Sequence, residues 1–286
     1  MKFKNFMQDL EQDQCSDLEK IEIDLLLEGI YRHYGFDFRH YAFSSIRRRI
    51  WHRIKAEKME TVTALLDRIL HEPLMMEKLY LDFSINVTEM FRDPLFFKAI
   101  RCKVLPLLSE LPSIRIWHAG CSTGEEAFSM AILLHETGLY HKAKIYATDM
   151  NNHVIQQAKL AQFPLKKMKE YTNNYVNSDG INDFSEYYMV KGEKAVFHKE
   201  LAKNIIFAQH NLVTDGSFNE FHLIVCRNVL IYFDRELQAR VHDLFLNSLS
   251  SKGFLALGNR EGLSFSKKEK YYTVFDEDEK IFRRIQ

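Results

Sequence analysis

Residues 114–134 combine an apolar run, a turn with two glycines and a second apolar run at helical spacing. Gly120 and Gly124 let the backbone approach a ligand closely and adopt positive φ values. The helix that follows would offer unpaired backbone N–H groups. The pattern predicts a nucleotide-like ligand at residues 119–126, although an ordinary strand-to-helix turn would look the same.

The ligand predicted at this turn carries no phosphate. The glycine spacing fits neither G-x-G-x-x-G nor G-x-x-x-x-G-K-[ST], the patterns of phosphate-binding loops. Glu125 and Glu126 would repel phosphate but suit a cationic or hydroxyl-rich ligand. Asp149 ends the next apolar run, where acidic residues of doubly wound folds bind ribose hydroxyls. The turn and Asp149 together predict a nucleoside, whereas Asp149 alone could simply cap a helix.

Further polar residues border other apolar runs. They are Asn86, Thr88 and Arg92 ahead of Pro94, Asn211 and Leu212 after one run, and Arg227 and Asn228 after another. An arginine directly after four apolar residues, as at Arg227, is an unusual choice for packing alone. Open α/β sheets bind ligands outside the carboxyl ends of their strands, so these clusters are candidates for one site. The cluster before Pro94 would by itself also fit a capped helix start.

The elements that must position these residues divide the chain into two parts. Between residues 21 and 85, apolar residues such as Ile46, Ile50 and Ile54 repeat at helical spacing, which predicts a small helical bundle. After Pro94, short apolar runs alternate with helical or polar stretches, which indicates a mainly parallel sheet with crossover helices. We therefore predict an α/β fold with a helical domain at residues 1–84 and a second domain at residues 85–286.

Two antiparallel features are expected within the second domain. Candidate strands at residues 271–275 and 280–284 flank an acidic turn and should form a hairpin at one edge of the sheet. Residues 166–201 are less regular, and two alternating runs around Gly192 predict a small β subdomain there.

The composition indicates a globular protein without a strong net field. Apolar residues make up 46% and charged residues 27%, so neither a disordered nor a fibrous class is indicated. Lysine plus arginine (39) equals aspartate plus glutamate (39), which argues against steering to nucleic acid or a membrane surface. Since no secretion signal or membrane-spanning apolar run is found, we expect a cytoplasmic protein without membrane insertion.

The four cysteines are widely spaced and have no histidine at zinc-finger spacing. We predict neither a disulfide nor a metal site. Cys121 and Cys226 fall inside the motifs above, and we expect them to be small buried packing residues, with redox sensitivity as the alternative.

Taken together, these segments closely resemble the CheR family, the S-adenosylmethionine-dependent methyltransferases that esterify glutamate side chains of bacterial chemotaxis receptors. The resemblance covers the helical segment and the motifs at residues 86–92, 119–126, 146–149, 211–212 and 226–233, in the family order. It implies a receptor-recognition domain followed by a Rossmann-like methyltransferase domain with a small β subdomain.

The resemblance also implies a site that binds S-adenosylmethionine and forms S-adenosylhomocysteine. The implied cofactor residues are Asn86, Thr88, Arg92, Glu126, Asp149, Asn211, Leu212, Arg227 and Asn228. Asp149 would hold the ribose, and Arg92 and Tyr232 match positions near the transferred methyl. We expect Arg92 to orient a substrate carboxylate with its guanidinium fork, and Tyr232 to hydrogen-bond or to shape the site.

The helix expected around residues 41–58 is the candidate substrate contact. Between residues 47 and 58, six basic residues stand against Glu57 alone, and we expect contacts from Arg47, Arg48, Arg49 and Arg53. A solvated charged face is the alternative. The implied partner is the cytoplasmic helical domain of a chemotaxis receptor, bound by a monomer. The segment around Gly192 is too short for the insertion that docks a receptor's carboxyl-terminal pentapeptide in some members, so docking without that tether is expected.

Two other functions would use a similar cofactor site. A nucleic-acid methyltransferase could bind phosphates through the same basic helix. Enzymes that methylate base amino groups, however, commonly carry an Asn/Asp-Pro-Pro-aromatic turn where this chain has Cys226-Arg-Asn-Val. The neutral charge also argues against nucleic acid. A non-catalytic adaptor that binds the cofactor is the other alternative, but all the matched motif positions are filled.

Overall fold

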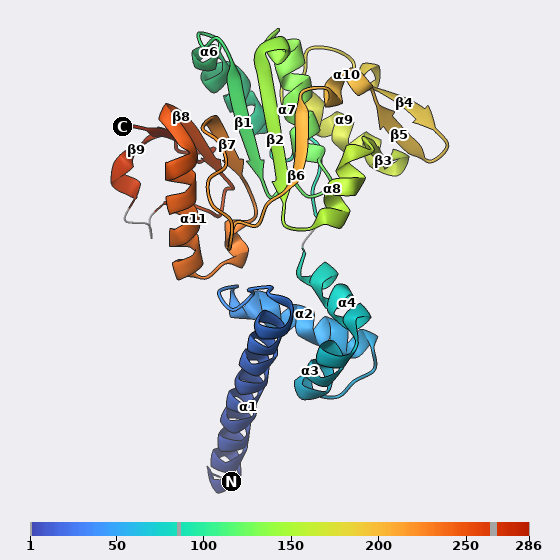
Figure 1. Cartoon of the computed structure of the whole chain (residues 1–286), viewed down its shortest axis with the longest axis vertical. Helices are drawn as coiled ribbons and strands as arrows, with labels where there is room; N and C mark the ends of the chain where they lie inside the picture. Colours follow the sequence, from blue (N-terminus) through green and yellow to red (C-terminus); the bar gives the residue numbers. More distant parts are fainter. Residues whose placement is uncertain (1, 85–86, 264–267, 286) are drawn as a thin grey trace. The chain divides into compact units, whose positions relative to one another are not determined.

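The computed structural model describes residues 2–84, 87–263 and 268–285, with side chains from residue 17 onward. The chain divides into two compact units (Figure 1). The first comprises Met1–Ile85 and Tyr232–Leu237, and the second comprises Asn86–Ile231 and Gln238–Gln286.

Helices make up most of the first unit. They are α1 (Lys2–Tyr34), α2 (Phe43–Ala56), α3 (Val62–His71) and α4 (Pro73–Phe83). On α2, Ile46, Ile50 and Ile54 share one face and are buried, so the predicted helical spacing is confirmed. Thr61 caps α3, because its hydroxyl accepts a hydrogen bond from the backbone N–H of Ala64 at 3.1 Å.

Residues 232–237 belong to this helical unit although they lie far along the chain. The backbone N–H of Ala42 donates to the carbonyl oxygen of Tyr232 at 2.7 Å. Tyr41 forms an isolated antiparallel bridge with Phe233, and their ring centroids lie 5.1 Å apart. Tyr232 therefore groups with α2, just before α11 (Arg235–Ser248) begins.

A seven-stranded sheet forms the centre of the second unit (Figure 1). Its strands, in spatial order, are β6 (Ile205–Gln209), β2 (Ala143–Asp149), β1 (Ile114–Ala119), β7 (Phe221–Cys226), β8 (Leu249–Leu257), β10 (Ile281–Arg284) and β9 (Tyr272–Asp276). The first five are parallel, and β10 pairs antiparallel with β8 and β9. The predicted parallel sheet and the hairpin at its edge are both confirmed.

Helices connect and cover these strands. They are α5 (Pro94–Ala99), α6 (Leu105–Leu108), α7 (Glu125–Glu136), α8 (Asn152–Lys159), α9 (Met168–Asn177), α10 (Lys199–Ala202) and the greater part of α11. Most residues of α7 are buried, and Phe128 and Ile132 on this helix join Ile116 and Ile145 of the sheet in one apolar core. Cys121 and Cys226 are buried as well, and burial raises the pKa of both thiols.

The predicted small β subdomain is a three-stranded antiparallel sheet. Its strands, in spatial order, are β3 (Gln162–Pro164), β5 (Lys194–Phe197) and β4 (Tyr188–Lys191). Gly192 lies between β4 and β5 with a φ of +58°, as the turn requires. The strand β3 begins before residue 166, where the subdomain was expected to start.

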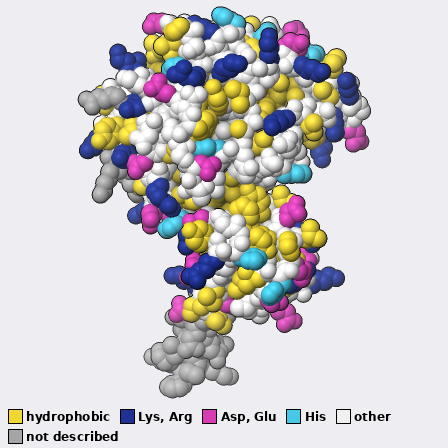
Figure 2. All heavy atoms as spheres, viewed as in Figure 1, with side chains coloured by type: hydrophobic (Ala, Val, Ile, Leu, Met, Phe, Trp, Pro, Cys, Tyr) yellow, Lys and Arg dark blue, Asp and Glu magenta, His cyan; other side chains and the backbone are white. Residues whose placement is uncertain are grey.

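The surface carries both signs of charge. Figure 2 shows basic and acidic side chains interspersed on the face drawn, in keeping with the equal totals of the sequence. In the described part of the chain, no helix is both long and apolar enough to cross a membrane. The same residues include no group of three or more histidine, cysteine, aspartate or glutamate side chains that could hold a metal ion.

Candidate active site

The carboxyl ends of β1, β2, β6 and β7 lie at one edge of the sheet because these strands are parallel. The predicted residues stand at this edge in chain order. They are the turn at residues 120–124, Asp149, Asn211, Leu212, Arg227 and Asn228. Glu126 joins them from the first turn of α7.

The glycine turn is tied to the neighbouring strand and leaves no room for larger residues. The backbone N–H groups of Gly120 and Cys121 both donate to the carbonyl oxygen of Thr148, each at 2.8 Å. Gly120 has a φ of +83°, and a Cβ there would lie 2.5 Å from Cγ2 of Val229. Gly124 has a φ of +96°. The two glycines therefore allow a turn that other residues would strain.

The Asp149 carboxylate accepts hydrogen bonds from two backbone N–H groups and can accept further ones from a ligand. Its Oδ2 accepts from the N–H of Ser122 at 3.0 Å, and its Oδ1 accepts from the N–H of Asn151 at 2.9 Å. Burial raises the pKa of Asp149, and these donors act in the opposite direction. Because each carboxylate oxygen can accept more than one hydrogen bond, Asp149 can still bind ribose hydroxyls.

Glu126 lies among positively charged and hydrogen-bonding groups. Its Oε1 is 2.8 Å from Nδ1 of His118, and its Oε2 is 3.6 Å from Nη1 of Arg227. Burial alone would raise the pKa of Glu126, but the hydrogen bond to His118 and the charges of Arg227 and Arg92 lower it overall. The carboxylate is therefore ionised and suits a cationic ligand.

Arg227 links two segments of the site. Its Nη2 lies 2.7 Å from Oδ2 of Asp93, and its guanidinium carbon lies 4.0 Å from the centre of the Phe96 ring. The Arg227 side chain is almost fully buried, so these contacts are shielded from water. Through Asp93 and Glu126, Arg227 connects the segment before α5 to the start of α7.

The segment that carries Arg92 has an unusual backbone. Phe91 and Asp93, on either side of Arg92, adopt positive φ values of +51° and +54°. The N–H of Phe91 donates to Oγ of Ser129 on α7 at 2.9 Å, which anchors the segment. The Arg92 Nη1 donates to the carbonyl oxygen of Val87 at 3.1 Å. Such strain concentrates at functional sites, and here it surrounds the residue expected to orient the substrate.

The remaining predicted cofactor residues lie in other segments. Thr88 accepts a hydrogen bond from Nζ of Lys167 through its carbonyl oxygen at 3.5 Å. Asn211 uses its Oδ1 to accept from the N–H of Val213 at 3.0 Å, and Leu212 is half-buried beside it. Asn86 lies outside the described residues.

Tyr232 belongs to the helical unit, so its expected place beside the transferred methyl stays a prediction. Within that unit, the Arg49 guanidinium lies 5.4 Å from the centre of the Tyr232 ring. The predicted substrate contact and the predicted catalytic tyrosine are therefore neighbours.

Sequence reasoning missed three residues of the site, namely Asp93, His118 and Glu261. Asp93 could have been found, because it stands next to Arg92 in a motif already singled out. The chain pattern gives no comparable signal for His118, a polar residue within a buried strand. Glu261 follows β8, and only its contacts with the turn after β7 reveal it.

The edge of the sheet offers a cofactor both donors and acceptors. Among the described atoms, Nε of Arg227, Nδ2 of Asn151 and Nδ1 of His210 are buried without a hydrogen-bond partner. The carboxylates of Glu126 and Asp149 supply acceptors. S-adenosylmethionine carries ribose hydroxyls, an amino group, a carboxylate and an adenine ring, so this set of residues fits it.

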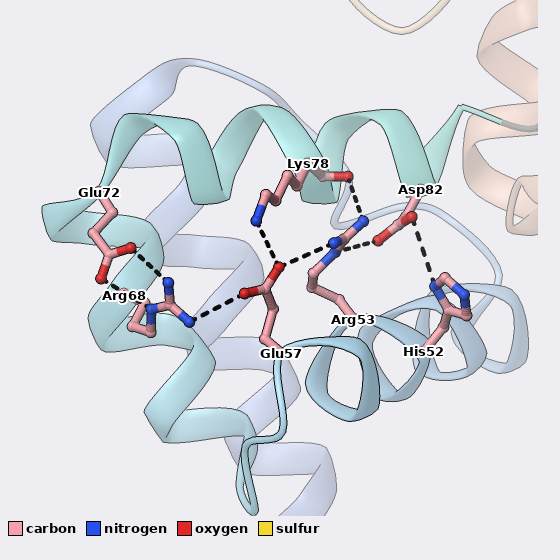
Figure 3. A network of polar contacts seen from close by, with 7 residues as sticks. All are labelled: His52, Arg53, Glu57, Arg68, Glu72, Lys78 and Asp82. Atoms are coloured by element: carbon pink, nitrogen blue, oxygen red, sulfur yellow. Dashed lines mark hydrogen bonds and ion pairs between the residues drawn. The ribbon is translucent and has the colours of Figure 1, made fainter.

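Of the four arginines expected to contact substrate, Arg53 is already paired (Figure 3). It contacts Asp82 at 2.7 Å and Glu57 at 3.3 Å, and Glu57 also pairs with Lys78 and Arg68. The Arg53 side chain is only 14% exposed. The charge counted along the sequence therefore overstated the positive field of α2, because carboxylates from other segments neutralise part of it.

The other three arginines differ from one another. Arg47 pairs with Glu19 at 2.7 Å. Arg49 is half-buried and donates to the carbonyl oxygen of Ser45 at 2.7 Å. Arg48 is exposed, and no described carboxylate lies within ion-pair distance of it. Arg48 is thus the arginine of this set most available to a partner.

Comparisons with known proteins cover both units. The family model described as "CheR methyltransferase, SAM binding domain" matches residues 86–280, and that described as "CheR methyltransferase, all-alpha domain" matches residues 21–84. A Pseudomonas putida protein that bears the name methyltransferase Cher3 is 47% identical over 264 residues, 92% of this chain and 97% of that protein. A Listeria innocua protein named chemotaxis protein methyltransferase is 30% identical over 234 residues, 81% of this chain and 86% of that protein. The cofactor is S-adenosylmethionine.

Proposed function

The chain belongs to the CheR family of S-adenosylmethionine-dependent methyltransferases, and on that premise we propose that it methylates glutamate carboxylates of chemotaxis receptors. The observation that supports this substrate is that three acidic residues at the cofactor edge are already engaged. Glu125 accepts from Thr123 at 2.6 Å, Glu126 contacts His118 and Arg227, and Asp149 accepts from backbone N–H groups. Such a site suits a nucleophile that needs no general base.

A glutamate side chain meets this requirement. With an ordinary pKa near ~4.3, it is almost wholly ionised at pH 7. S-adenosylmethionine supplies a methyl group attached to a positively charged sulfur. A carboxylate oxygen of the substrate bonds to that carbon while the carbon–sulfur bond breaks, so a methyl ester forms and no proton moves. Alignment of the reacting atoms then accounts for catalysis, at best about 7 to 11 kcal/mol of the barrier.

The residues of this chain divide the work of alignment. Glu126 and Asp149 bind cationic and hydroxyl groups of the cofactor, with Arg227 and Asn228 completing that side of the site. Arg92 orients the substrate carboxylate, because a guanidinium fork matches its two oxygens. Tyr232 shapes the site around the methyl group. Charge interactions with Arg92 help to lower the pKa of Glu126, which supports a place for Arg92 near the cofactor residues.

The helical unit would bind the receptor. We place the acidic helical domain of a receptor against α2 in the cytoplasm, with Arg48 as its principal contact and Arg47 beside it. The turn between β4 and β5 is short, which supports docking without a pentapeptide tether. The enzyme would act as a monomer.

Transfer of a labelled methyl group tests the proposal. The full chain is incubated with methyl-labelled S-adenosylmethionine and receptor cytoplasmic fragments, with and without the carboxyl-terminal pentapeptide. We expect label in both fragments, released as methanol by mild base, because glutamyl methyl esters are base-labile. A fragment whose acceptor glutamates are replaced by glutamine is the matched control and should stay unlabelled.

The other outcomes separate the competing functions. Base-stable label in the receptor would indicate a different acceptor atom, and label only in RNA would indicate a nucleic-acid methyltransferase. Binding of S-adenosylhomocysteine without any transfer would indicate a regulatory adaptor. Each of these results would contradict glutamate methylation.

A further inference from the structure

Glu261 is a buried carboxylate, 8% exposed, that follows β8. Its Oε1 accepts from the backbone N–H groups of Val229 at 2.8 Å and Ile231 at 3.3 Å. Its Oε2 accepts from those of Gly258 at 2.6 Å and Asn228 at 3.1 Å. Three of these four donors belong to the turn that follows β7.

This arrangement fits an ionised carboxylate. Each oxygen accepts two N–H groups, which leaves no geometric place for a carboxyl proton. Successive backbone N–H groups that converge on one point form a concavity for an anion. The pKa of Glu261 is raised, because burial outweighs the four donors, which act in the opposite direction. The Glu261 carboxylate therefore serves as the common acceptor for four backbone N–H groups, three of them in the turn after β7.

The turn held in this way reaches the cofactor loop. Asn228 has a positive φ of +60°, a conformation that the carboxylate fixes through the N–H of the same residue. Val229 packs against the glycine turn so closely that a Cβ at Gly120 would lie 2.5 Å from its Cγ2. Glu261 thus connects to residue 120 through one intervening residue.

We propose that Glu261 is a positioning residue for the cofactor, whose carboxylate holds residues 228–231 so that Asn228 and Val229 complete the site beside Gly120. This proposal rests on the proposed cofactor role of Asn228 and does not depend on which substrate is methylated. Glu261 acts through the turn and touches no reacting atom.

Two variants disturb the Glu261 carboxylate in different ways, one by removing its charge and the other by displacing it. Glu261→Gln keeps the size of the side chain but loses the charge and turns an NH₂ group toward N–H donors. Gly258→Ala keeps the carboxylate, but the added Cβ would lie 2.7 Å from Oε2 of Glu261 and 2.9 Å from the nitrogen of Asn228. Glu277→Gln makes the same chemical change as the first variant at an exposed residue and is the control.

Affinity for S-adenosylhomocysteine, measured by isothermal titration calorimetry on the full chain, is the readout. We expect Glu261→Gln and Gly258→Ala each to weaken binding about tenfold or more, as expected for lost hydrogen bonds to a charged group. The control variant Glu277→Gln should change the affinity for S-adenosylhomocysteine less than about twofold. Exchange of the backbone amides of residues 228–231 with deuterium should become faster in both variants.

A double-mutant cycle separates positioning from general stability. Asn228→Gly removes the amide side chain yet tolerates the positive φ, and it keeps the N–H that Glu261 binds. If Glu261 acts through Asn228, combining this variant with Glu261→Gln will weaken binding less than the product of the two single effects. Unchanged affinity in folded Glu261→Gln and Gly258→Ala, or effects that multiply fully, would overturn the proposal. Neither result would bear on glutamate methylation, which the labelling experiment tests.

Discussion

Arg92 is flanked by two residues with positive φ, and its side chain is expected to act on the substrate carboxylate. We predict that Arg92→Ala lowers kcat about 100-fold or more, in line with the loss of one preorganised charged donor. Arg92→Lys should recover only part of this loss, because an ammonium group keeps the charge without the bidentate fork. Single-turnover methyl transfer to a receptor fragment measures the effect. Full turnover with an unchanged KM in Arg92→Ala would refute the assignment.

The pKa of Glu126 is lowered in the folded protein, and this has a consequence for stability. A depressed carboxyl pKa contributes stability above the unfolded value, near ~4.3, and loses it as the pH falls through the folded pKa. Urea unfolding of the wild type and of Glu126→Gln between about pH 3 and 7 tests this. We expect the wild type to be more stable by a constant margin above about pH 5.5, and the margin to shrink below ~4.3. A margin that grows with acidity would contradict the charge environment described for Glu126.

At the residue scale, the sequence predicted which side chains lie at strand ends, but it did not predict which residues they contact. The place of Asp149 at the end of β2 was predictable, because it follows from the apolar run in the chain alone. The pairing of Arg53 with Asp82 was not, because it joins α2 to α4 through tertiary packing. Glu261 was missed for the same reason, since its significance comes from backbone groups about 30 residues earlier.

The turn between β1 and α7 packs against the turn after β7, and the two should be jointly sensitive to side-chain size. Gly120→Ala would place a Cβ 2.5 Å from Cγ2 of Val229 and would also strain a residue with a φ of +83°. We predict that it weakens S-adenosylhomocysteine binding and lowers the free energy of unfolding by about 1 to 3 kcal/mol.

The variant Val229→Ala provides the matched test of this contact. It removes the atom that clashes, so the double variant Gly120→Ala/Val229→Ala should regain part of the lost stability and affinity. The backbone term should remain, because alanine still disfavours a positive φ. Calorimetric titration and urea unfolding would measure both quantities. No recovery in the double variant would show that Val229 does not limit the space at residue 120.

Elements were predictable where apolar runs were long enough. The core strands were found because buried parallel strands read as near-continuous apolar runs, as in β7 with its pattern Leu-Ile-Val-Cys. The strand β3 has only three residues, too few to show an alternating pattern. The helix α1 begins at Lys2, well before residue 21, where the apolar helical spacing begins. This early start was not predictable, because the first residues are mostly polar and give no apolar periodicity.

At the scale of the whole molecule, the sequence indicated two parts but not how the chain is shared between them. The segment Tyr232–Leu237 groups with the helical unit because Ala42 and Tyr41 pair with its backbone. Such long-range pairing leaves no mark in local periodicity. The chain therefore passes from the sheet unit into the helical unit and back. The predicted catalytic residue Tyr232 lies in the segment that belongs to the helical unit.

Two arginines of α2 should have different roles. We expect Arg53 to contribute to the stability of the helical unit and Arg48 to contribute to receptor binding. Arg53→Ala removes the guanidinium that joins Asp82 to Glu57 in a largely buried network, so we predict a loss of about 1 to 3 kcal/mol in the free energy of unfolding. Arg48→Ala removes an exposed charge and should leave stability within about 0.5 kcal/mol of the wild type. It should instead raise the KM for a receptor fragment, and that difference should diminish at high salt because exposed charges are screened. Urea unfolding and methyl transfer at two salt concentrations measure both effects. An unchanged KM in Arg48→Ala would remove α2 as the docking surface, since its other arginines already have partners within the unit.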